Sequence, residues 1–131
     1  MSSARSKVSA CILASCMVGA LAMVPGGASA ARPVAHIAVA CHFHGTEQEH
    51  LGPSYVTSLN VHGTSCANGK RVVQAYYNCR VRSGGVKGTC HHSVLGYYCT
   101  EHRQGISIQF DASVSCVNGS RRVNHTYTQN T

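Results

Sequence analysis

The chain has 131 residues, of which 44% are hydrophobic and 11% charged, and its formal net charge is +7. This length allows one small domain. There is no tryptophan, only 6% of residues are aromatic, and no five like charges stand together. A base-stacking platform and a polybasic tail are therefore excluded, and we expect no specific nucleic-acid partner. The positive charge either serves solubility or attracts an anionic polymer of the cell envelope.

Residues 1–30 have the pattern of a secretory signal peptide. Arg5 and Lys7 give a basic start, an apolar run covers 8–24, and Ala28-Ser29-Ala30 is a small-x-small cleavage site. We therefore expect a secreted or extracellular protein in which residues 31–131 form a single disulfide-stabilised domain.

A second interpretation of the leader is a bacterial lipobox. Leu13-Ala14-Ser15-Cys16 fits such a motif, which would make Cys16 a lipid anchor. A lipoprotein leader places its apolar region before that cysteine, whereas here the apolar run continues past it to Val24. Cleavage at Ala30 is favoured for this reason. No other stretch is long enough to span a membrane, so we expect no membrane span.

Two segments after the leader alternate with the period of a strand. Residues 36–44 place Ile37, Val39, Cys41 and Phe43 on one face. Residues 55–62 alternate again, with Tyr55, Thr57, Leu59 and Val61 on one side. A polar loop joins the two predicted strands.

The next segment fits either a helix or a hairpin. As a helix over about 65–80, it has Ser65 as a cap and apolar residues at helical spacing. As a hairpin, Asn68-Gly69 is the turn. The same Cys-x-Asn-Gly pattern recurs at Cys116 to Gly119, which would fit a duplicated hairpin as well as chance.

The C-terminal segments predict strands. Residues 94–99 follow a glycine-rich link and predict a strand. Apolar residues then alternate from Ile106 to Cys116, Asn118-Gly119 marks a turn, and Val123, His125 and Tyr127 alternate on the return. The pattern predicts a β-hairpin over about 105–128.

Several short motifs resemble small secreted cysteine-containing proteins of unknown function from actinobacteria. The motifs are Thr64-Ser65-Cys66-Ala67, the segment 71–79, Gly96-Tyr97-Tyr98-Cys99 and Val114-Ser115-Cys116, within residues 55–128. In those relatives the Ser-Cys-Ala segment looks helical, so the resemblance implies a helix at 65–80. We therefore predict an α+β fold, with one helix on an antiparallel sheet that ends in the hairpin; an all-β fold is the alternative. The family supplies no catalytic residue.

Six cysteines remain after the leader is removed. An even number in a small exported domain predicts three disulfides rather than thiolate chemistry. Cys79–Cys90 is the favoured pair, because it would close the glycine-rich loop, and the other partners stay open. The candidate disulfide residues are Cys41, Cys66, Cys79, Cys90, Cys99 and Cys116.

Histidines are the remaining candidates for chemistry. His42-x-His44 on a strand would put two imidazoles on one face, where they suit Cu(II), Ni(II) or Zn(II). No metal motif with paired spacing supports the site, and no cofactor motif is present. His125 and Glu47 are residue types that a hydrolase needs, but no motif fixes their geometry, so no catalytic residue is assigned.

The sequence thus favours a non-enzymatic binding module, secreted or associated with the envelope, whose partner is an anionic polymer or a protein. The alternatives are a cationic antimicrobial or hydrolytic effector and a histidine-based metal binder.

Overall fold

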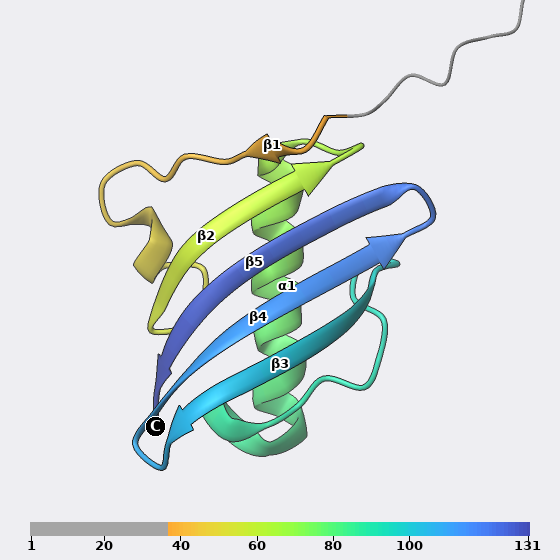
Figure 1. Cartoon of the computed structure of the whole chain (residues 1–131). Helices are drawn as coiled ribbons and strands as arrows, with labels where there is room; N and C mark the ends of the chain where they lie inside the picture. Colours follow the sequence, from red (N-terminus) through yellow and green to blue (C-terminus); the bar gives the residue numbers. More distant parts are fainter. Residues whose placement is uncertain (1–36) are drawn as a thin grey trace, which may run out of the picture. The chain divides into compact units, whose positions relative to one another are not determined.

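The computed structural model describes residues 37–131, and the predicted signal peptide, the Cys16 lipobox and His36 lie outside them. Among the described residues a single α-helix crosses a five-stranded antiparallel sheet, so the fold is α+β as predicted (Figure 1). The strands are β1 (Val39–Ala40), β2 (Tyr55–His62), β3 (Tyr98–Ile106), β4 (Gln109–Asn118) and β5 (Arg121–Asn130). The helices are α1 (Cys66–Gly84) and the short 3₁₀ turns η1 (Glu47–Glu49) and η2 (Gly85–Lys87).

The sheet order is β1-β2-β5-β4-β3, with every pair antiparallel. The connection through α1 carries the chain from β2 to the far edge of the sheet, and β4 and β5 then return to its centre (Figure 1). One face of the sheet packs against α1, with a core of Val56, Leu59, Val61, Val72, Val73, Tyr76, Phe110, Ala112, Val114, Val123 and Tyr127. No helix among residues 37–131 is long and apolar enough to cross a membrane.

The ambiguous segment is a helix, and its contacts explain the Asn-Gly pair in the first turn. Asn68 donates its backbone N–H to the Ser65 hydroxyl at 3.2 Å and its side-chain amide to Thr64 at 2.9 Å. Gly69 is buried against β2, where an added Cβ would lie 2.6 Å from Val61 Cγ1. Glycine lowers helix propensity here but lets the helix approach the sheet. Asn118-Gly119 forms the turn between β4 and β5, whereas Asn68-Gly69 lies within α1. The hypothesis of a duplicated hairpin is therefore wrong.

Ser65 is the N-cap, and its removal tests how much the cap contributes. We expect Ser65→Ala to lower the free energy of unfolding by about 1 kcal/mol, because the Asn68 N–H loses its acceptor. Urea denaturation measures the change. Ser93→Ala, at an exposed loop serine, is the control and should be near neutral. Equal midpoints for the two variants would contradict the role of the cap.

Three local predictions are corrected. The strand at 36–44 is limited to Val39–Ala40. A register irregularity between Val56 and Ser58 puts Val56, not Tyr55 or Thr57, on the buried face with Leu59 and Val61. The strand expected at 94–99 begins only at Tyr98, because Val94 and Tyr97 bond to each other across a turn.

The C-terminal hairpin is confirmed, with its first strand beginning later than predicted. β4 starts at Gln109, so Ile106 and Ile108 lie at the β3–β4 turn and are 69% and 67% exposed.

Three disulfides tie the elements together, as the even cysteine count predicted. Cys79–Cys90 is the predicted pair and links α1 to the following loop. Cys41–Cys66 joins the segment after β1 to the start of the helix, and Cys99–Cys116 joins β3 to β4.

Candidate functional site

The sheet face turned away from α1 is the candidate site, and we call it the open face. In Figure 1, α1 lies behind the sheet, and no helix or loop of residues 37–131 crosses the open face. Strand pairing places its side chains in two neighbouring rows that cross β2, β5, β4 and β3. The first row is Ser58, Thr126, Ser113 and His102, and the second is Asn60, Asn124, Ser115 and Thr100.

The open face is hollowed. A cavity of about 300 Å³ is lined by all the side chains of the two rows. A second hollow of about 350 Å³ adjoins it through Ser113 and Thr126 and extends to Asp111 and Gln104. Neighbouring strands lie about 4.8 Å apart, so hydroxyls and amides repeat across the face at this interval.

The hydroxyls on the open face already form short contacts. Thr126 Oγ1 lies 2.7 Å from Ser58 Oγ and 2.5 Å from Thr57 Oγ1. Thr128 donates to Asp111 Oδ1 at 2.6 Å, which partly satisfies the carboxylate at the edge of the hollow. These bonds orient the hydroxyls of Ser58, Thr126 and Thr128, and the two rows together present both donors and acceptors.

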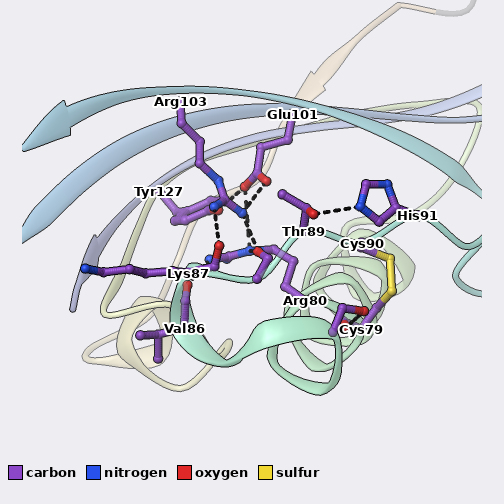
Figure 2. A network of polar contacts seen from close by, with 12 residues as sticks. Cys79, Arg80, Val86, Lys87, Thr89, Cys90, His91, Glu101, Arg103 and Tyr127 are labelled. Atoms are coloured by element: carbon purple, nitrogen blue, oxygen red, sulfur yellow. Dashed lines mark hydrogen bonds and ion pairs between the residues drawn. A yellow bond between two sulfur atoms is a disulfide. The ribbon is translucent and has the colours of Figure 1, made fainter. Parts of the chain in front are cut away.

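A buried charged cluster lies on the opposite side of the sheet, between β3 and the end of α1 (Figure 2). Glu101 is at its centre with its side chain 6% exposed. Its carboxylate receives a hydrogen bond from Arg103 Nη2 at 2.6 Å and another from the Tyr127 hydroxyl. Arg80 Nε lies 3.7 Å from the same carboxylate.

The two arginines also bind the loop that follows α1. Arg80, which is fully buried, donates to the carbonyl oxygen of Val86 at 2.7 Å. Arg103 donates to the carbonyl oxygens of Lys87 at 2.8 Å and Gly88 at 2.5 Å (Figure 2). Two guanidinium groups and one carboxylate therefore fasten this loop to the sheet. The cluster is a structural clamp, because its carboxylate and both guanidinium groups bond within the protein; Arg80 Nη1 and Arg103 Nε are buried without a hydrogen-bond partner among the described residues.

Aromatic rings complete the cluster. The guanidinium carbon of Arg80 lies 4.7 Å from the centre of the Tyr127 ring. Burial raises the pKa of Tyr127 well above its usual range, and the hydrogen bond to Glu101 raises it further. Burial and the charge of Glu101 likewise raise the pKa of Tyr76. Both phenols therefore stay neutral and act as donors.

The histidine candidates do not gather. His42 and His44 are exposed and follow β1, so the strand geometry that would pair their imidazoles is absent. Among residues 37–131 there is no group of three or more histidine, cysteine or acidic side chains placed to hold a metal ion.

The residue types considered for hydrolysis lie in unsuitable positions. His125 is 2% exposed and faces the core. Glu47 is held by Lys70 at 2.6 Å, and this hydrogen bond lowers the pKa of its carboxyl group.

Sequence reasoning missed the open face as a site. The signal for it was the polar residues that alternate with apolar ones along each strand, such as Ser113 and Ser115 in β4. The rows themselves depend on which strands are neighbours.

The chain was compared with protein-family models, curated proteins and solved structures, and no match was found. The resemblance to secreted actinobacterial proteins therefore stays a prediction.

Proposed function

We propose that this protein is a secreted or envelope-associated binding module that holds a neutral, polyhydroxylated polymer, such as a glycan chain, on the open face. The observation that carries the proposal is the hollowed array of hydroxyl and amide side chains across β2, β5, β4 and β3. The three disulfides support an oxidising, extracellular compartment for this module.

The chemistry of the array favours a ligand that both donates and accepts hydrogen bonds. Serine and threonine hydroxyls do both, and an asparagine amide offers an acceptor oxygen beside two N–H donors. An anion would use only the donors, and an apolar ligand would leave the polar groups unpaired. A polyhydroxylated chain matches both kinds of group and repeats along its length, as the rows do.

The distribution of charge also favours a neutral ligand over the anionic polymer expected from composition. Only His102 is titratable within the two rows. Several basic side chains are already occupied elsewhere: Lys70 pairs with Glu47, Arg80 is buried, and Arg103 is bonded to Glu101. The hollow therefore has no concentration of cations to hold a polyanion.

Binding to insoluble polysaccharides tests the proposal. Purified protein is mixed with suspensions of cellulose, chitin and peptidoglycan, and the protein left in solution is measured. We expect depletion by at least one of them, with an affinity that about 0.5 M salt leaves unchanged, because neutral hydrogen bonds are not screened.

Asn60→Ala with Asn124→Ala should weaken this binding about tenfold, since two amides at neighbouring positions are lost. The matched control is Asn78→Ala, at an exposed asparagine on α1. No depletion by any polysaccharide, or equal binding by the double variant and the control, would overturn the proposal. Binding abolished by salt would indicate an anionic ligand instead.

A further inference from the structure

The outer edge of β3 is long and unpaired. β3 runs from Tyr98 to Ile106 and pairs with β4 on one side, and no strand among residues 37–131 pairs on the other. The opposite edge of the sheet is partly covered, because β1 pairs with β2 and Cys41 donates to the carbonyl of Leu59 at 2.8 Å. An exposed edge of this length is a template for pairing with another chain.

The direction of the free backbone groups follows from the β3–β4 register. Cys99 lies directly opposite Cys116, with their Cα atoms 4.0 Å apart, as in a non-hydrogen-bonded pair. Because the pattern alternates, Cys99, Glu101 and Arg103 turn their N–H and C=O groups away from β4. Within the described residues no backbone group bonds to them. These groups are available to a further strand.

The edge also has space beside it. A groove of about 650 Å³ lies between β3 and the loop that holds Thr89 and His91. Glu101 and Arg103 line the same groove, so the unpaired backbone groups border it. No described element fills this space.

The sequence of β3 is complementary to itself in one antiparallel register. The central residue of the strand is His102. Pairing around this centre places Glu101 opposite Arg103 of the second copy. It also places Tyr98 opposite Ile106 of the second copy, and these side chains are 74% and 69% exposed in the single chain. Apolar side chains across a strand pair attract each other, so the Tyr98–Ile106 pairs are favourable. Glu101 and Arg103 already bond to each other within each chain, so their placement in this register serves to keep like charges apart.

Other nearby registers are poorer. A centre at Glu101 would place the two Glu101 residues opposite each other, and a centre at Arg103 would oppose two arginines. Like charges directly across a strand pair are destabilising. The full-length register around His102 avoids both clashes. It also lets Cys99, Glu101 and Arg103 exchange backbone hydrogen bonds with the second copy, because outward-facing residues then lie opposite each other.

We propose that the protein forms a symmetric dimer in which β3 pairs antiparallel with β3 of a second copy. The interface is self-complementary, as a two-fold axis requires. The two sheets become one continuous sheet, with both open faces on the same side. Two sites on one side would bind a repeating polymer with higher avidity than one site. The dimer itself does not depend on what the open face binds.

Charges introduced at positions 100 and 104 test the proposed β3–β3 register. Thr100 and Gln104 are exposed, neutral and brought opposite each other only in the proposed dimer. In Thr100→Glu with Gln104→Glu, two carboxylates face each other at each of the two symmetric positions. In Thr100→Glu with Gln104→Lys, opposite charges face each other instead. Neither change touches the core or the cluster around Glu101, so both variants should fold.

Sedimentation equilibrium gives the dissociation constant of each form. We expect the unmodified protein to reach twice the monomer mass as its concentration rises. The variant with two added acids should dimerise about tenfold more weakly, and the variant with opposite charges should recover most of this loss. A protein that remains monomeric at submillimolar concentration, or two variants with the same dissociation constant, would overturn the proposal.

Discussion

Glu101→Gln is expected to lower the free energy of unfolding by about 3–5 kcal/mol. Glu101 is the only acid that contacts Arg80 and Arg103 among the described residues. Its loss leaves two guanidinium groups between the sheet and α1 without a compensating charge, which is costly in a buried site. Urea denaturation measures the loss. Glu49→Gln, at an exposed glutamate, is the matched control and should change stability by less than about 0.5 kcal/mol.

Arg80→Met distinguishes the charge argument from a simple packing defect. When Glu101 is present, the loss of Arg80 leaves the carboxylate paired with Arg103, so the cost should be smaller than that of Glu101→Gln. Added to Glu101→Gln, Arg80→Met removes an uncompensated buried charge and should restore about 1 kcal/mol or more. Costs that simply add in the double variant would contradict coupling within the cluster.

Acid is expected to destabilise the protein through His125. The imidazole is 2% exposed, lies between Tyr76 and Tyr127, and has no hydrogen-bond partner for either ring nitrogen among residues 37–131. The pKa of His125 falls from 6.5 to about 4, mainly because the imidazole is buried; the charge of Glu101 opposes this fall and the charge of Arg80 adds to it. The folded protein therefore keeps this histidine neutral where the unfolded chain protonates it.

The sign of the effect follows from proton binding. Between pH 6.5 and about 4 the unfolded state binds more protons at this residue, so the free energy of unfolding falls as the pH falls. The loss in free energy of unfolding caused by His125 reaches about 3 kcal/mol near pH 4 and is close to zero above pH 7. The free energy of unfolding measured by urea denaturation should therefore be about 2–3 kcal/mol lower at pH 4.5 than at pH 7 because of this group alone.

His125→Leu should remove most of this pH dependence. His42→Leu is the matched control, because His42 is exposed and its loss should leave the slope unchanged. An unaltered slope in His125→Leu would show that another group carries the acid sensitivity.

The sequence predicted the elements well where periodicity was regular. The alternation in β4 and β5 predicted that Phe110, Val114, Val123 and Tyr127 would face the core, and they do. In β2 the irregularity at Thr57 shifts the alternation by one position, so Val56 replaces Tyr55 on the buried side. A single sequence with period-two alternation gives no sign of such a shift.

The helix could be predicted only incompletely. Residues 72–79 have helical spacing, but the Asn68-Gly69 pair is equally typical of a turn. What makes this segment helical is its surroundings: Asn68 also donates to the Tyr97 hydroxyl at 3.2 Å, and Gly69 contacts Val61. Tertiary contacts of this kind override local propensity.

The sequence by itself predicted three disulfides from the six cysteines that follow residue 30, and strands with one polar side, but it left residues 65–80 open between a helix and a hairpin. These properties depend on residue type and on spacing within one segment. Only the tertiary structure decided that β2 and β5 are neighbours, that Glu101 lies between two arginines, and that the polar sides form one hollowed face. The candidate site belongs to this second group, because its side chains come from strands up to about 70 residues apart and meet only through sheet pairing.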